Sequence, residues 1–220
     1  MMDVRTAAAL GLRIIALWLL VASAFGQSPS PSPSSISPDK KWQYIGGDAP
    51  KIVEADSNQV ALEFSEGCSL GGFGENSTVF WPPDSRRLAF YSCGEGKEHL
   101  TLLYQLRDAR WVALKTPGDG DKLFERVGNI IEAQAKRKGL PKKTFLHMQW
   151  WKVEPERWLD SRTLAIHVSM AEVVHRDNGE YVGPSFGTDL LLTVEFDDAG
   201  DWKIVKTHRM SEKEIKKFEH

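Results

Sequence analysis

The sequence predicts an α+β protein: mainly antiparallel β-meanders in two repeated units, with one central amphipathic helix packed on the sheet and a short C-terminal helix. Three observations predict this fold class. From about residue 39 onward, short segments alternate apolar and polar residues, and turn-forming residues separate them. Residues 119–138 carry apolar residues at helical spacing. A tryptophan-containing motif occurs in both halves of this region.

The first 26 residues have the pattern of a signal peptide. Arg5 and Arg13 precede an apolar run (IIALWLLVASA), and Ala22-Ser23-Ala24 or Ala24-Phe25-Gly26 offers a cleavage site. A membrane anchor is the alternative, but the uncharged run is shorter than the roughly 20 residues that a span requires. We therefore expect residues 1–26 to be removed and the mature protein to be exported, periplasmic or extracellular, with no stable membrane span.

Residues 27–38 (QSPSPSPSSISP) are a Pro/Ser-rich, low-complexity segment. Such a segment buries little and stays semi-extended, so we interpret it as a linker, either a functional spacer or an N-terminal segment without a role. A single globular β-rich domain, residues 39–220, is expected to follow. The net charge of the chain is −2, which gives no basic field for nucleic acid.

The only two cysteines, Cys68 and Cys93, lie in the exported part of the chain. An oxidising compartment favours a disulfide between them, and closing a loop of roughly 25 residues contributes about 3 kcal/mol in the chain-entropy model. Two buried free thiols are the alternative. Two cysteines without a clustered histidine pair do not make a zinc site.

The strands of the first half follow from alternation and from turn residues. They are expected at residues 42–45, 51–54 and 59–64, and then in a meander formed by the strand after a turn at 83–85, by residues 100–106 and by residues 111–115.

The expected helix begins after a capping Asp119 or Asp121 and ends at Gly139 and Pro141. Strand patterns resume near residues 144–152, 163–174, 189–196 and 202–207. Ser211 and Glu214 form a capping-box pattern, which predicts the short terminal helix.

The two halves of the domain repeat one pattern. WPPDSRRLAFYS (81–92) matches WLDSRTLAIHVS (158–169), and LLYQLRDARWVALKT (102–116) matches LTVEFDDAGDWKIVKT (192–207) in the same order. The halves therefore look like copies of one meander, with an insertion around residues 175–187 in the second. Coincidence between two amphipathic strand patterns is the alternative.

SPDKKW (37–42) and WPPDSRRLAF (81–90) resemble the W-S-P-D-G-K-x-L-A-F signature of the WD40-like repeats in TolB-type β-propellers. In that family each motif marks one four-stranded blade, so the resemblance implies the same local turn and strand geometry here. Lys40 and Ser85 replace the glycine of the signature. The motif is structural in that family and brings no catalytic residues.

No contiguous catalytic motif, phosphate-binding loop or dinucleotide fingerprint occurs in the chain. We therefore predict no catalytic residue, no cofactor and no metal site. His167 and His175 flank Glu172, but in a strand their odd separations from Glu172 place the carboxylate on the other face.

The candidate binding residues are Trp150 and Trp151, because neighbouring residues of a strand point to opposite faces and one ring can face a sugar or a partner. The favoured function is an exported, non-enzymatic binding or protein-interaction module for a protein or glycan partner. One alternative is a secreted or periplasmic hydrolase whose non-contiguous active site uses turn carboxylates such as Asp84 and Asp160. Another is a purely structural envelope component.

Overall fold

The computed structural model describes residues 35–64, 77–93, 99–116, 122–140, 144–176 and 178–216. The chain divides into two units, Met1–Ser30 and Pro31–His220, and every described residue belongs to the second. The expected signal peptide, most of the expected linker and Cys68 lie outside the described residues.

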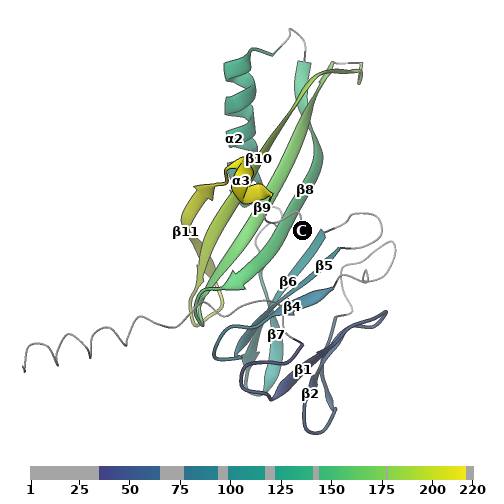
Figure 1. Ribbon diagram of the computed structural model, residues 1–220, viewed down its shortest axis with the longest axis vertical. Helices are drawn as coiled ribbons and strands as arrows, with labels where there is room; N and C mark the ends of the chain where they lie inside the picture. The colour runs from purple at the N-terminus through teal and green to yellow at the C-terminus, as the bar shows by residue number, and fades with distance from the viewer. Residues whose placement is uncertain are drawn as a thin grey trace, which may run out of the picture. The chain divides into compact units, whose positions relative to one another are not determined.

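The described residues form three antiparallel sheets and two helices, so the α+β, mainly antiparallel fold class is confirmed (Figure 1). The first sheet contains β1 (Trp42–Ile45), β2 (Lys51–Glu54) and β3 (Val60–Glu63). The second contains β4 (Thr78–Phe80), β5 (Arg87–Cys93), β6 (His99–Arg107) and β7 (Arg110–Leu114). The third contains β8 (Thr144–Trp158), β9 (Thr163–Arg176), β10 (Tyr181–Phe196) and β11 (Trp202–Arg209). The helices are α2 (Lys122–Lys138) and α3 (Glu212–Ile215).

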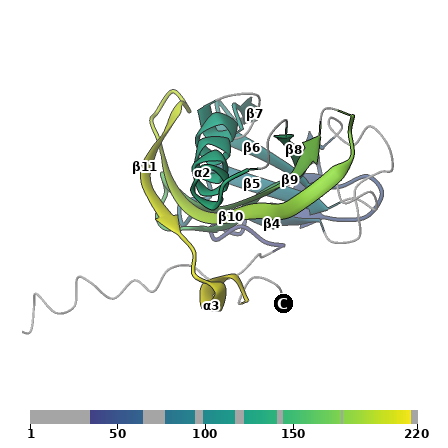
Figure 2. The same cartoon turned by 90° about the horizontal axis from the view of Figure 1, so that it is seen from above.

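Helix α2 lies on one face of the third sheet and α3 on the other (Figure 2). The side chains of Leu123, Val127 and Ile131 in α2 are fully buried, and they share one core cluster with alternate residues of β9 and β10. The residues of β9 and β10 in this cluster are Leu164, Ile166, Val168, Met170, Val174, Phe186, Leu190, Leu192, Val194 and Phe196. Burying each large apolar side chain stabilises the fold by about 1.5–3 kcal/mol. No helix among the described residues is long and apolar enough to cross a membrane.

A second core cluster lies between the first and second sheets and is rich in aromatic rings. Phe64 stacks on Phe90 with ring centroids 4.1 Å apart, and Trp111 contacts both Trp42 and Trp81 at 5.4 and 5.9 Å. All five rings are at most 9% exposed. These three tryptophans therefore serve packing.

Each of three turns is closed by an aspartate that accepts a hydrogen bond from the backbone amide two residues later. Asp39, Asp84 and Asp160 bind the amides of residues 41, 86 and 162 at 3.1, 3.1 and 2.7 Å. Lys40 and Ser85, at the glycine position of the signature, have φ of 63° and 58°, the left-handed conformation that glycine adopts most readily. The backbone amide of Asp39 also donates to Ser85 Oγ at 3.0 Å, which joins two of the turns.

The second and third sheets are held together by side chains that reach the backbone of the other sheet. The buried guanidinium of Arg87 donates to the carbonyl oxygens of Ser161 at 2.8 Å and Asp197 at 3.0 Å. Thr101 Oγ1 donates to the Val153 carbonyl at 2.6 Å. These bonds satisfy carbonyl groups at the turns and along β8, so the two sheets are joined by specific polar contacts as well as by packing.

Strands β9 and β10 extend through the region where the sequence indicates an insertion, residues 175–187. Tyr181 pairs with His175 and Ser185 with Val173, and the register shifts between these two pairs. Pro184 lies within the irregularity, where a missing ladder hydrogen bond is tolerated. This segment therefore lengthens the β9–β10 hairpin.

Candidate functional site

The face of the third sheet opposite α2, here called the outer face, carries polar and aromatic residues where strand alternation takes them away from the core. In β9, His167, Ser169 and His175 alternate with the buried residues that contact α2. Residues paired across neighbouring strands share a face, so the register extends the outer face over β8 and β10. It assigns to that face Phe145, His147, Trp150, Lys152 and Glu154 of β8 and Tyr181, Ser185, Gly187 and Asp189 of β10.

A β-bulge determines which of the two adjacent tryptophans reaches the outer face. Met148 pairs with Glu172, whereas Trp150 pairs with Ala171, a shift of one residue. Trp151 therefore faces α2, where its ring packs edge-on against Phe124 at 5.4 Å. Trp150 lies on the outer face and is 44% exposed. Of the two candidate binding residues, Trp150 is the one that an external ligand can reach.

At one end of β8–β10, the outer face carries a group of aromatic side chains, here called the aromatic patch: Phe145, His147, Trp150, His175 and Tyr181. The ring of His175 lies 6.1 Å from Phe145, 5.3 Å from His147 and 6.2 Å from Tyr181. Phe145 is 45% exposed and Tyr181 58%. So much exposed aromatic surface in one place is typical of an interaction site.

Next to the aromatic patch, the outer face carries a network of ionisable groups. Asp189 Oδ1 accepts hydrogen bonds from His167 Nε2 at 3.0 Å and from the Ser169 hydroxyl at 2.5 Å. Glu154 Oε2 lies 4.0 Å from His167 Nδ1 and forms an ion pair with Lys152. Three strands of the sheet thus contribute to one network.

The surroundings of this network shift several pKa values. Burial acts to raise the pKa of Asp189, but the hydrogen bonds from His167 and Ser169 and the nearby cations outweigh it, so the pKa is lowered. Burial, followed by the charge of Glu154, raises the pKa of Tyr91 on the second sheet. The Tyr91 hydroxyl lies 2.7 Å from Nδ1 of His99, whose pKa is lowered by burial and then by Lys152.

The network does not have the geometry of a nucleophilic triad. A serine nucleophile needs its hydroxyl hydrogen-bonded to the histidine that accepts its proton. Here the Ser169 hydroxyl donates to Asp189, and His167 donates to the same carboxylate oxygen. The two hydrogen bonds join β9 to β10, and Asp189 is the common acceptor.

The turn carboxylates and the histidine pair singled out in the sequence are not brought together. Asp84 and Asp160 each bind their own turn. Glu172 faces α2, and burial followed by the charge of Glu132 raises its pKa. His167 and Glu172 are thus on opposite faces, and the described residues contain no cluster of three potential metal ligands.

Cys93 lies at the end of β5, opposite His99 in the register, and is half-buried. Because Cys68 is outside the described residues, the Cys68–Cys93 disulfide remains a prediction.

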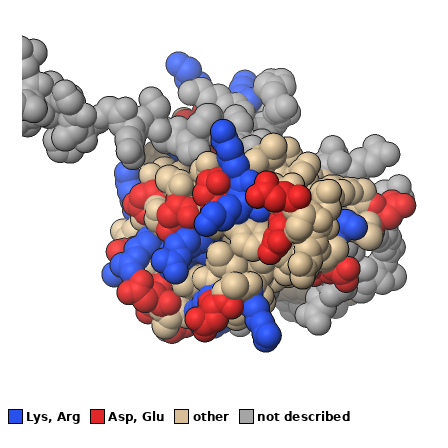
Figure 3. Space-filling view, turned by 90° about the horizontal axis from the view of Figure 1, so that it is seen from below, with Lys and Arg blue, Asp and Glu red and all other residues tan. Residues whose placement is uncertain are grey.

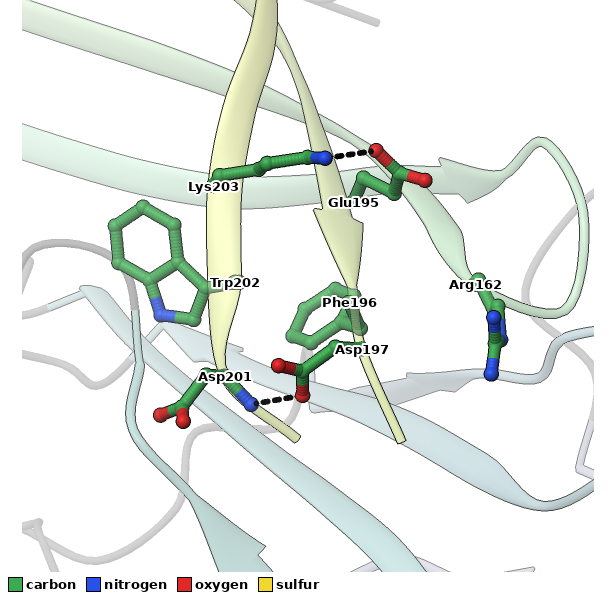
Figure 4. A pocket seen from close by; sticks show the side chains of 7 residues that line it. All are labelled: Arg162, Glu195, Phe196, Asp197, Asp201, Trp202 and Lys203. Atoms are coloured by element: carbon green, nitrogen blue, oxygen red, sulfur yellow. Dashed lines mark hydrogen bonds and ion pairs between the residues drawn. The ribbon is translucent and has the colours of Figure 1, made fainter. Parts of the chain in front are cut away.

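A hollow of about 260 Å³ lies at the β10–β11 turn (Figure 4). Its charged groups are engaged with one another: Lys203 Nζ lies 3.0 Å from Glu195 Oε2, and the Asp201 amide donates to Asp197 at 3.0 Å. Arg162, which also lines the hollow, pairs with Asp198. On the face shown in Figure 3, basic and acidic side chains likewise lie beside one another. We therefore regard this hollow as a weaker candidate than the outer face.

The sequence did not single out Asp189, Glu154 or Ser169. Polar residues at alternate positions, Lys152 with Glu154 and His167 with Ser169, were the available signal, but alternation is equally typical of any half-exposed strand. No protein-family model matches the chain, and no curated protein matches it.

Proposed function

We propose that the chain is an exported, non-enzymatic binding module that recognises its partner through the aromatic patch. The observation that supports this most directly is the exposure of Phe145, Trp150 and Tyr181 on one face of a sheet whose other face is buried by α2. Exposed rings of this size contribute strongly to binding once a partner removes them from water.

Export is part of the proposal and is supported by the signal-peptide pattern of residues 1–26. The mature protein would act in the periplasm or outside the cell.

We also propose that the second and third sheets are copies of one meander and that the signature turns share their geometry with TolB-type repeats. Both sheets have four strands in sequential order. In each, an Asp-closed turn (Asp84, Asp160) joins the first two strands, and a tryptophan (Trp111, Trp202) lies in the last. The central helix, amphipathic by its pattern, separates the two copies.

The binding proposal is tested by cross-linking and affinity capture of the tagged, exported protein from its own host. Three proteins are compared: wild type, Trp150→Ala/Tyr181→Ala, and Val205→Ala as a control. Val205 is 49% exposed on β11, outside the patch. We expect wild type and control to retain the same stoichiometric partner and the double variant to lose it. Equal recovery from all three proteins would refute a role for the patch.

A hydrolase is the second candidate, and the network of Glu154, His167 and Asp189 is the observation that favours it over the turn carboxylates. Two carboxylates beside one imidazole can exchange protons with a bound substrate. Chromogenic ester and glycoside substrates test this directly. If the protein turns over a substrate, and this activity is abolished in His167→Gln but retained in Trp150→Ala/Tyr181→Ala, the chain is an enzyme and the binding-module proposal is wrong.

A further inference from the structure

Beside the aromatic patch, the outer face is hollowed because β9 and β10 carry small side chains there. Ser185 of β10 pairs with Val173 of β9, and both line the hollow. Across the sheet, β8 presents the larger His147. Small residues beside large ones leave a hollow of about 630 Å³, whose lining includes residues of all three strands. A volume of this order is that of a small-ligand site.

The polar groups of this hollow are amide, hydroxyl and imidazole groups. Gln149, Ser185, His147 and His175 line it together with Tyr181, and none of its described lining residues is Asp, Glu, Lys or Arg. Two charge pairs among the described residues lie on the neighbouring parts of these strands. Arg176 Nη1 lies 2.7 Å from Glu180 Oε2, and Lys152 pairs with Glu154.

This combination restricts the chemistry of a ligand. A charged ligand would lose its hydration without finding a counter-charge. A purely apolar ligand would cover the amide and hydroxyl groups without giving them hydrogen bonds, which costs about 1–3 kcal/mol for each buried group. A sugar satisfies both requirements, because its C–H face packs on aromatic rings and its hydroxyls exchange hydrogen bonds with neutral side chains.

The spacing of the rings sets the size of the ligand. Phe145 and Trp150 are five positions apart on β8, which corresponds to about 15 Å along a strand. Tyr181 lies across the sheet, and His175 connects it to Phe145. We propose that the hollow and the aromatic patch together bind a neutral oligosaccharide several sugar units long. This inference rests on the proposed binding function.

The test is to titrate the mature protein with cellohexaose, xylohexaose, chitohexaose and maltohexaose. Tryptophan fluorescence and calorimetry measure the binding. A heparin hexasaccharide serves as the charged comparison. We expect at least one neutral hexasaccharide to bind at micromolar to millimolar concentration. Binding should weaken by about tenfold or more in Trp150→Ala and in Tyr181→Ala. It should stay within about twofold of wild type in Val205→Ala. Thermal unfolding of each variant verifies that it is folded.

Two results would overturn the inference: no binding of any of the four neutral sugars, or binding of the heparin fragment alone. Its failure can be distinguished from failure of the proposed function. If no sugar binds but the Trp150→Ala/Tyr181→Ala variant loses a captured protein partner, the module binds protein and only the sugar is wrong. If neither sugar binding nor partner capture depends on the aromatic patch, both proposals fail.

Discussion

His167 and Asp189 are 22 positions apart in the chain and lie on neighbouring strands, where His167 Nε2 is 3.0 Å from Asp189 Oδ1. The contact is almost closed to solvent on the histidine side, where the side chain is 5% exposed. It joins β9 to β10 at the position where the ionic network adjoins the aromatic patch. Disturbing it should therefore affect stability and, through strand register, the ligand surface.

Asp189→Asn should lower stability in a pH-dependent way. The pKa of Asp189 in the folded protein is below its unfolded value of about 3.9, so its stabilising contribution is complete above that value and is lost as pH falls through the folded pKa. We expect the variant to be less stable than wild type by about 1 kcal/mol at pH 7, and the difference to shrink near pH 3. Urea unfolding at both pH values measures this. A difference that grows on acidification would contradict it, and the exposed Asp48→Asn is the control.

Arg87→Met should destabilise the protein by about 1–3 kcal/mol, because a buried guanidinium is lost and two partly buried carbonyl groups lose their donor. Arg86→Met is a matched control, since Arg86 is the adjacent residue and is exposed. Urea unfolding followed by tryptophan fluorescence compares the two. Equal losses would show that the guanidinium does not hold the sheets together.

Gly200→Ala should lower the stability of the protein more than Gly179→Ala does, although both glycines have a positive φ, of 84° and 83°. A Cβ at Gly200 would lie 2.5 Å from Leu114 Cδ2, whereas one at Gly179 meets nothing within 4 Å. We expect about 1 kcal/mol for Gly179→Ala from backbone strain alone, and about 2–4 kcal/mol for Gly200→Ala from strain and overpacking. Thermal unfolding of both variants measures this, and similar midpoints would be the contrary result.

Lys40→Gly should stabilise the protein, because Lys40 has the left-handed φ of 63° that the repeat signature normally gives to glycine. Relief of this strain should outweigh the greater freedom of glycine in the unfolded chain by roughly 0.5–1 kcal/mol. Lys41→Gly, without that strain, should instead destabilise. If both substitutions destabilise equally, the likeness of this turn to the signature turn is superficial.

The expected disulfide gives a prediction about thiols. The exported protein, denatured without reductant, should show no thiol that reacts with a thiol reagent, and Cys68→Ser should show one. Reduction should lower stability by about 3 kcal/mol. Two reactive thiols in the wild-type chain would rule out the bridge.

Sequence patterns were sufficient to predict those elements in which the spacing of apolar residues follows from a single buried face. The helix was expected at residues 119–138 and α2 is Lys122–Lys138, because its apolar positions recur every three or four residues against a single sheet. The length of β10, Tyr181–Phe196, was missed because Gly183, Pro184 and Gly187 are typical of turns. Long-range pairing with β9 overrides that local preference.

The site could be predicted only in part for a related reason. Trp150 and Trp151 attracted attention as adjacent rings, but the one-residue bulge before Trp150, which decides which ring is outside, depends on pairing with β9. The meeting of Glu154, His167 and Asp189 depends on the register of three strands. Register is a property of the assembled sheet, so no local pattern in any one strand contains it.

The partners of Arg87 also bear on the order in which the chain can fold. Its two acceptor carbonyls come 74 and 110 residues later in the chain, at Ser161 and Asp197. A chain emerging N-terminus first could complete the pairing of β4–β7 long before either acceptor exists, leaving this guanidinium with water as its partner until Ser161 is added. Contacts so distant in sequence form slowly. Truncation before Ser161 should therefore leave the Arg87 guanidinium without either of these acceptors, at a surface that the third sheet normally covers.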